Sequence, residues 1–122
     1  MSIEVLKGET LIKVKRGVDG DGDFIYFETG KGKKYKMNHK SVCCENVYIK
    51  DICGDLNDLI GNPITMAEET SNLKQRDGEY SDRVKWTFYK LATKRGYVTI
   101  SWVGSDNGYY SVSVYFGEIS TF

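Results

Sequence analysis

Residues 85–103 read KWTFYKLATKRGYVTISWV and carry the clearest β-strand signal in the chain. It contains two runs rich in aromatic and β-branched residues, Lys85–Ala92 and Tyr97–Val103, joined by a glycine turn. Asp106-Asn107-Gly108 is a hairpin signal, and Tyr109–Phe116 would follow it as a third strand. The alternation places two apolar sets on core-facing sides: Val98, Ile100 and Trp102, and then Val112, Val114 and Phe116. The C-terminal third therefore predicts a three-stranded antiparallel meander.

Upstream, the same reasoning gives a second group of strands. They are expected at Thr10–Lys15, Phe24–Glu28, Lys34–Met37 and Asn46–Ile52. Thr29–Lys33 is rich in glycine and predicts a hairpin turn. We expect a mainly β, α+β domain: one twisted antiparallel sheet, made of the C-terminal meander and the N-terminal hairpin, with one short helix.

The short helix is expected at Gly54–Gly61. Asp55 is its candidate N-cap, Gly61 is its stop, and its apolar side chains share one helical face. By contrast, Glu69–Asp82 is polar and lacks an apolar period, so its composition predicts a mobile loop.

The composition limits the class of protein. The chain of 122 residues is long enough for a single domain, expected over 1–122. Lys and Arg number 17 and Asp and Glu number 17, which argues against a dedicated duplex-DNA binder and against a strongly acidic DNA mimic. No apolar run approaches the ~20 residues of a membrane span. We expect a cytoplasmic protein without a signal peptide.

The three cysteines and the only histidine lie within residues 39–53. His39, Cys43, Cys44 and Cys53 form the pattern His-x3-Cys-Cys-x8-Cys, and an odd cysteine count disfavours disulfides. Cys3His is a ligand set of structural zinc, and four protein ligands leave no position for a catalytic water. We therefore expect structural Zn²⁺ at these four residues.

Adjacent cysteines on a regular strand point to opposite faces, so both can bind one ion only where the strand is interrupted. If Cys44 points away, Asp51 or Asp55 could supply an oxygen ligand. Two other interpretations stay open: the cysteines are small buried apolar residues with His39 in an exposed loop, or one of them is a redox thiol.

The other motifs carry less information. Asp19–Asp23 resembles a calcium loop but lacks its glycine and its final glutamate, so a solvated turn is favoured. Lysines 31, 33, 34, 36 and 40 could contact phosphates, but the sequence shows no aromatic platform beside them. Tyrosines 109, 110 and 115 straddle both faces of a strand, which could expose a recognition surface. No catalytic constellation accompanies the thiols, so we expect no enzyme and no catalytic residue.

The central segment His39–Ile64, with its Cys-Gly-Asp-Leu at 53–56, resembles a family of small bacterial and phage domains of unknown function. The similarity covers about residues 24–117 and includes Trp86–Thr93, Gly96–Ile100 and Gly108–Ser111. The chain also looks like a type II anti-CRISPR protein of a mobile element, a class with zinc-containing members of this size. That resemblance implies a partner, the host's RNA-guided effector nuclease, but transfers no binding residue.

Together these observations predict a non-enzymatic, zinc-stabilised phage or mobile-element protein that binds and inhibits a CRISPR effector nuclease. Because the net charge is zero, docking on a protein lobe that obstructs target-DNA loading is preferred over phosphate mimicry. The contact would be a tyrosine-bearing face with acidic rim groups. We expect a monomer with no direct nucleic-acid or membrane partner. The alternatives are a protein-interaction module with another partner and a Cys-dependent enzyme.

Overall fold

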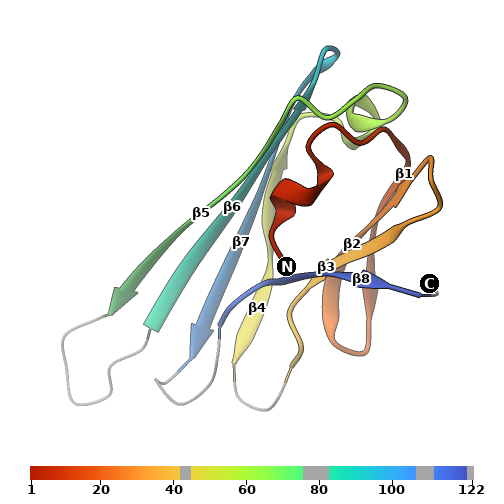
Figure 1. Ribbon diagram of the computed structural model, residues 1–122. Coiled ribbons are helices and arrows are strands. Elements are labelled where there is room, and N and C mark those ends of the chain that lie inside the picture. Colours follow the sequence, from red (N-terminus) through yellow and green to blue (C-terminus); the bar gives the residue numbers. More distant parts are fainter. Residues whose placement is uncertain (42–44, 76–82, 107–111, 121–122) are drawn as a thin grey trace.

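A computed structural model describes residues 1–41, 45–75, 83–106 and 112–120 of the chain. Within these ranges the chain forms eight strands and two single-turn 3-10 helices (Figure 1). The strands are β1 (Leu11–Asp19), β2 (Gly22–Thr29), β3 (Lys34–Asn38), β4 (Asn46–Cys53), β5 (Met66–Gln75), β6 (Arg83–Thr93), β7 (Gly96–Asp106) and β8 (Tyr115–Ile119).

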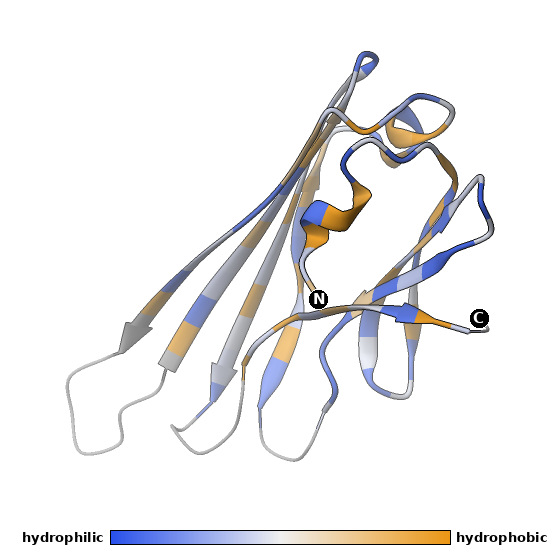
Figure 2. Ribbon diagram, viewed as in Figure 1, coloured by the Kyte–Doolittle hydropathy of each residue, from blue (hydrophilic) through white to orange (hydrophobic). Residues whose placement is uncertain are grey.

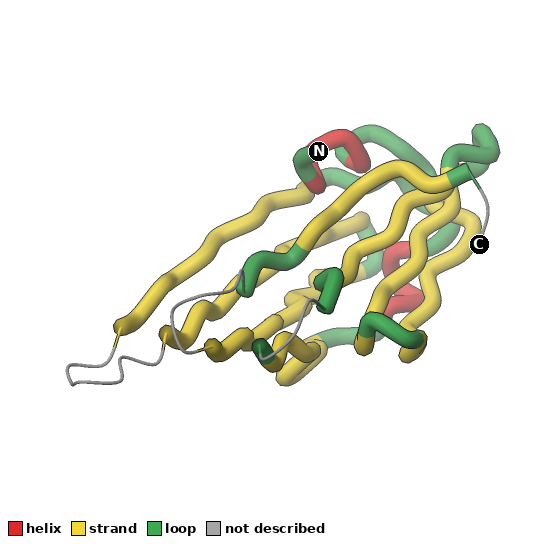
Figure 3. The backbone as a smooth tube through the Cα atoms, turned by 90° about the horizontal axis from the view of Figure 1, so that it is seen from below, coloured by secondary structure: helices red, strands yellow, loops and turns green. Residues whose placement is uncertain are grey.

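The strands form two antiparallel sheets of four strands each. The N-terminal sheet has the order β1-β2-β3-β8, and the C-terminal sheet has the order β4-β7-β6-β5. In Figure 1 the ends of β5 and β6 point away from the N-terminal sheet, and Figure 3 shows the strands from below. This two-layer arrangement lets each sheet bury one face against the other.

The core lies between the two sheets, and Figure 2 shows apolar positions alternating with polar ones along the strands. Trp102 of β7 is 1% exposed, and its indole nitrogen donates to the Met37 sulfur of β3 at 3.3 Å. Phe116 of β8 stacks on Tyr35 of β3 with their ring centroids 5.3 Å apart. The predicted core face of Val98, Ile100 and Trp102 is confirmed.

The segment leading into β8 lies against the C-terminal sheet before it reaches the other one. A Cβ atom on Gly104 of β7 would lie 2.9 Å from Val112 and 2.9 Å from Val47 of β4. A glycine at 104 therefore lets Val112 approach the β7 backbone closely. Val112 is buried, so this contact belongs to the packed interior.

The predicted α+β class is wrong, because the described residues contain no α-helix. The expected helix is the single 3-10 turn Leu56–Leu59, and a second one lies at Ile3–Leu6. The Asp55 cap is confirmed: its side chain accepts from the Asn57 backbone N–H at 2.9 Å. Gly54 and Gly61 both have positive φ, so the stretch between them is too short for an α-helix.

Two predicted connections are also corrected. β8 does not complete a meander beside β7; it pairs with β3 in the other sheet, and Phe116 lies opposite Met37. Glu69–Gln75, expected to be loop, belongs to β5 and pairs residue by residue with β6. Residues 76–82 and 107–111 lie outside the described ranges. The hairpin of β2 and β3 around Thr29–Lys33 is confirmed.

Candidate functional site

His39 is buried at the end of β3 and connects three segments. It is 2% exposed, its Nδ1 lies 2.7 Å from the Ser113 carbonyl oxygen, and its Nε2 lies 3.1 Å from Glu45 Oε1. Because a carbonyl oxygen only accepts, Nδ1 donates to Ser113, and the contact between Nε2 and Glu45 is bridged by a second proton, carried by one of these two groups. The ring thus joins β3 to the residue that precedes β4 and to the segment that leads into β8.

Cys53 lies at the far end of β4 and is exposed. Its thiol donates to Asp51 Oδ2 at 3.3 Å. This hydrogen bond, together with the charge of the Asp51 carboxylate, raises the pKa of the Cys53 thiol. A raised pKa reduces the thiolate fraction that nucleophilic attack or metal binding requires.

The geometry separates the predicted zinc ligands. Glu45 contacts His39 at the start of β4, and Cys53 ends the same strand. Eight extended residues span roughly 25 Å, so a single ion cannot bind both His39 and Cys53. Asp51 and Asp55, considered as replacement ligands, lie near the Cys53 end as well.

Cys43 and Cys44 lie outside the described residues. Within the ranges that the structure describes, no group of three or more His, Cys, Asp or Glu side chains is placed to hold a metal ion. The described residues therefore place two of the four predicted ligands, His39 and Cys53, apart. Structural Zn²⁺ in this chain stays a prediction.

The outer face of the C-terminal sheet carries an aromatic row that sequence analysis missed. Across its strands, Tyr48 of β4 lies opposite Val103 of β7, which lies opposite Trp86 of β6. Phe88 shares this face, and its ring is nearly parallel to that of Trp86, at 7° with centroids 5.9 Å apart. We call Tyr48, Trp86, Phe88 and Val103 the aromatic patch.

The aromatic patch is partly open to solvent. Tyr48 is 37% exposed, and Trp86 and Phe88 are half-buried. The same face carries the exposed carboxylates Asp51 and Glu68 at its borders. Part of the patch could have been predicted, because alternation along β6 places Trp86 and Phe88 on the side away from the core. Tyr48 could not, because its position beside them depends on the register of β4 against β7.

The outer face of the N-terminal sheet carries aromatic rings that lysines cover. The Lys36 ammonium lies 5.0 Å from the centre of the Phe24 ring, and the Lys13 ammonium lies 5.6 Å from that of Tyr26. Lys36 also pairs with Asp19 at 2.6 Å. One member of the predicted lysine cluster, Lys36, thus does have an aromatic neighbour, contrary to expectation, but that ring is buried beneath it.

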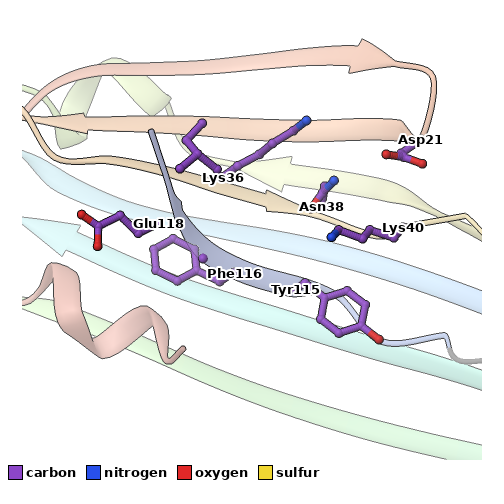
Figure 4. Close-up of a pocket in the computed structure, with 9 residues that line it drawn as sticks. Asp21, Lys36, Asn38, Lys40, Tyr115, Phe116 and Glu118 are labelled. Carbon is purple, nitrogen blue, oxygen red and sulfur yellow. The ribbon is translucent and has the colours of Figure 1, made fainter. Parts of the chain in front are cut away.

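A cavity of about 600 Å³ lies beside β8 (Figure 4). Tyr115, which is 48% exposed, and Lys40 line one end of it, and Glu118 lines the other. Tyr115 is the predicted recognition tyrosine that the structure describes, and it lies on the N-terminal sheet. Tyr109 and Tyr110 are outside the described ranges.

Comparisons place the chain in a family. The model described as Domain of unknown function (DUF7448) matches residues 4–116, so the chain belongs to this family. No curated protein and no solved structure matches it. Of the helices that the structure describes, none is long and apolar enough to cross a membrane.

Proposed function

We propose that this chain is a non-enzymatic domain that docks on a protein through the aromatic patch. The observation that carries the proposal is the row Tyr48–Val103–Trp86 across three strands. Following the sequence resemblance, the proposed partner is a CRISPR effector nuclease whose target-DNA loading is obstructed.

The composition of the patch supports docking on a protein. Trp and Tyr are enriched among the residues that dominate binding energy, because they bury a large area with few rotatable bonds. The stacked pair of Trp86 and Phe88 is held by the sheet before any partner arrives, so little side-chain entropy is lost on binding. Asp51 and Glu68 would form a polar rim facing cations of the partner.

The charge balance supports a protein surface over a nucleic-acid channel. With zero net charge, the chain has no general electrostatic attraction to the phosphate-binding channel of a nuclease or to DNA. The proposal also works without a bound metal. His39, with its bonds to Ser113 and Glu45, already links the segments that a structural ion would link.

The decisive experiment combines a pull-down with a plasmid-interference assay in cells that carry the effector. Trp86→Ala should weaken effector binding at least tenfold, or about 1.4 kcal/mol, and should restore interference. Tyr97→Ala is the matched control, because Tyr97 is 74% exposed on the same sheet face but lies at its other end. Tyr97→Ala should bind like the unmodified protein.

If the unmodified protein neither binds the effector nor changes interference, the effector is not the partner. If it binds and Trp86→Ala binds equally well, the aromatic patch is not the contact. Turnover of a substrate that depends on Cys53 would contradict the non-enzymatic part of the proposal. Elemental analysis of the purified protein tests the separate zinc prediction.

A further inference from the structure

The edges of the two sheets differ in how they are protected against pairing. β1 has a register shift between Leu11 and Lys13, and β4 has one between Ile49 and Asp51. β8 is only five residues long. Bulges and short length are established ways in which edge strands avoid joining another chain.

β5 has neither of these protections along its described length. It runs for ten residues, Met66–Gln75, and its pairing with β6 shows no register shift. The 3-10 helix at Ile3–Leu6 packs near its first residues, around a hollow lined by Glu4, Met66 and Glu68. The remainder of the strand forms a straight margin of the C-terminal sheet (Figure 1).

The solvent exposure of β5 determines which kind of strand can pair with its free edge. Residues 68–73 are all exposed, so both faces of the strand meet solvent there. An ordinary amphipathic strand added at this position would leave its apolar side uncovered. The matching strand is therefore one that is polar on both faces, and β5 itself meets this requirement, with Leu73 as its one large apolar residue within 68–73.

We propose that β5 pairs antiparallel with β5 of a second copy, which joins two C-terminal sheets into one sheet of eight strands. The register that places Ser71 opposite the partner's Ser71 keeps each face on its own side and forms a cross-strand hydroxyl pair at the centre. In this register Thr70 faces the partner's Asn72, and Glu69 faces the partner's Leu73. No two carboxylates lie directly opposite, so the strand is electrostatically compatible with itself.

The resulting dimer relies on main-chain hydrogen bonds and small polar side chains, so it should be reversible and depend on concentration. It also carries both aromatic patches on one side of a continuous sheet, because a twofold axis perpendicular to a sheet keeps each face on its own side. The inference is independent of the proposed effector, and it departs from the monomer expected from sequence.

The test is the mass of the purified full-length chain, measured by sedimentation equilibrium between about 5 and 500 µM. The unmodified protein should approach twice its 13.9 kDa mass with rising concentration. The acidic variant, Thr70→Glu/Ser71→Glu, places carboxylates opposite one another across the twofold axis and should stay monomeric. The basic variant, Thr70→Lys/Ser71→Lys, should stay monomeric for the same reason.

An equimolar mixture of the acidic and basic variants should restore the dimer, because opposite charges then face each other. Restoration also shows that both variants are folded, and thermal unfolding followed by circular dichroism checks this directly. Asn46→Glu/Ser120→Glu is the charge-matched control, with both exposed positions outside β5, and it should dimerise like the unmodified chain.

Three results would overturn the proposal: an unmodified chain that is monomeric throughout the range, an acidic variant that still dimerises, or folded variants whose mixture stays monomeric. A dimer abolished by Trp86→Ala but kept in the acidic variant would assign self-association to the aromatic patch instead.

Discussion

Both sheets place aromatic rings on their outer faces, but they treat them differently. On the N-terminal sheet, Phe24 is 7% exposed and Tyr26 is 2% exposed, each beneath a lysine ammonium. On the C-terminal sheet, Trp86 and Phe88 are half-buried and stack on each other. The aliphatic parts of lysine side chains cover apolar surface while the ammonium groups stay hydrated. Lysines over the rings therefore disfavour association of this face with another protein.

The difference separates rings that serve stability from rings that are available to a partner. A ring under a lysine contributes its buried area to folding, whereas a ring open to solvent gains burial only on binding. Substitution of a ring under a lysine should therefore lower the free energy of unfolding more than substitution of a ring in the aromatic patch. For the affinity of a partner, the order of the two effects should be reversed.

The largest expected effect is on folding. Phe24→Ala should lower the free energy of unfolding by about 3 kcal/mol, because it removes a buried ring and leaves a cavity. Trp86→Ala should lower it by only about 1 kcal/mol, because the ring is already partly exposed in the folded chain. Urea denaturation followed by circular dichroism measures both. Equal losses for the two variants would remove the distinction between the faces.

A second comparison concerns Gly17, which lies beneath the Phe24 ring. A Cβ atom on Gly17 of β1 would lie 2.5 Å from the Phe24 ring, so Gly17→Ala should displace it and cost about 2 kcal/mol. Gly117→Ala in β8 is the control, since its Cβ atom would meet nothing within 4 Å. Its effect should stay within about 0.5 kcal/mol. Thermal unfolding of both variants gives the answer, and a neutral Gly17→Ala would show that Phe24 is not tightly seated.

The pH dependence of stability in alkaline solution tests whether the Tyr26 hydroxyl is buried beside Glu28. Burial, together with the neighbouring Glu28, raises the pKa of Tyr26 from 10.0 to about 12. Between these values the unfolded state loses the phenol proton and the folded state keeps it, so Tyr26 contributes stability that is lost as pH rises from 10 to 12. Tyr26→Phe should flatten this decline and cost about 1 kcal/mol at neutral pH. Urea midpoints at pH 8 and 11 measure it; an unchanged slope would contradict the assignment.

The smallest expected effect concerns Lys36, the lysine that covers the Phe24 ring. Lys36 donates to Asp19 and thereby lowers the pKa of that carboxyl below its ordinary 3.8. The pair therefore stabilises the fold at neutral pH, and this contribution disappears as pH falls through the lowered pKa. Lys36→Met should cost about 0.5 kcal/mol at pH 7, with the difference from the unmodified chain vanishing near pH 2. A difference that persists in acid would point to lost packing over Phe24 instead.

Strand positions were predictable where the chain carries its own apolar alternation. β2, β3, β4, β6 and β7 all follow from side-chain patterns that the core later buries. β5 was missed because Glu68–Asn72 has no apolar face; this strand exists through its pairing with β6. Local pattern cannot reveal a strand whose stability comes from its neighbour.

The partner strand of β8 and the separation of His39 from Cys53 were mispredicted for a related reason. Closeness in sequence suggested that β8 continues beside β7 and that Cys53 approaches His39. In the fold, the extended β4 turns a sequence interval of fourteen residues into separate ends of a strand. The contacts of His39 could not be anticipated, since Ser113 lies far along the chain.

The pairing of β8 with β3 also fixes the order in which this protein can be completed. β5, β6 and β7 are consecutive antiparallel neighbours and can pair as soon as they leave the ribosome, whereas β3 gains its second neighbour only from β8, which is made after the other seven described strands. During synthesis the β3 margin is an open template for strands of other nascent chains. Pairing of β8 with β3 thus covers this edge and ends its exposure.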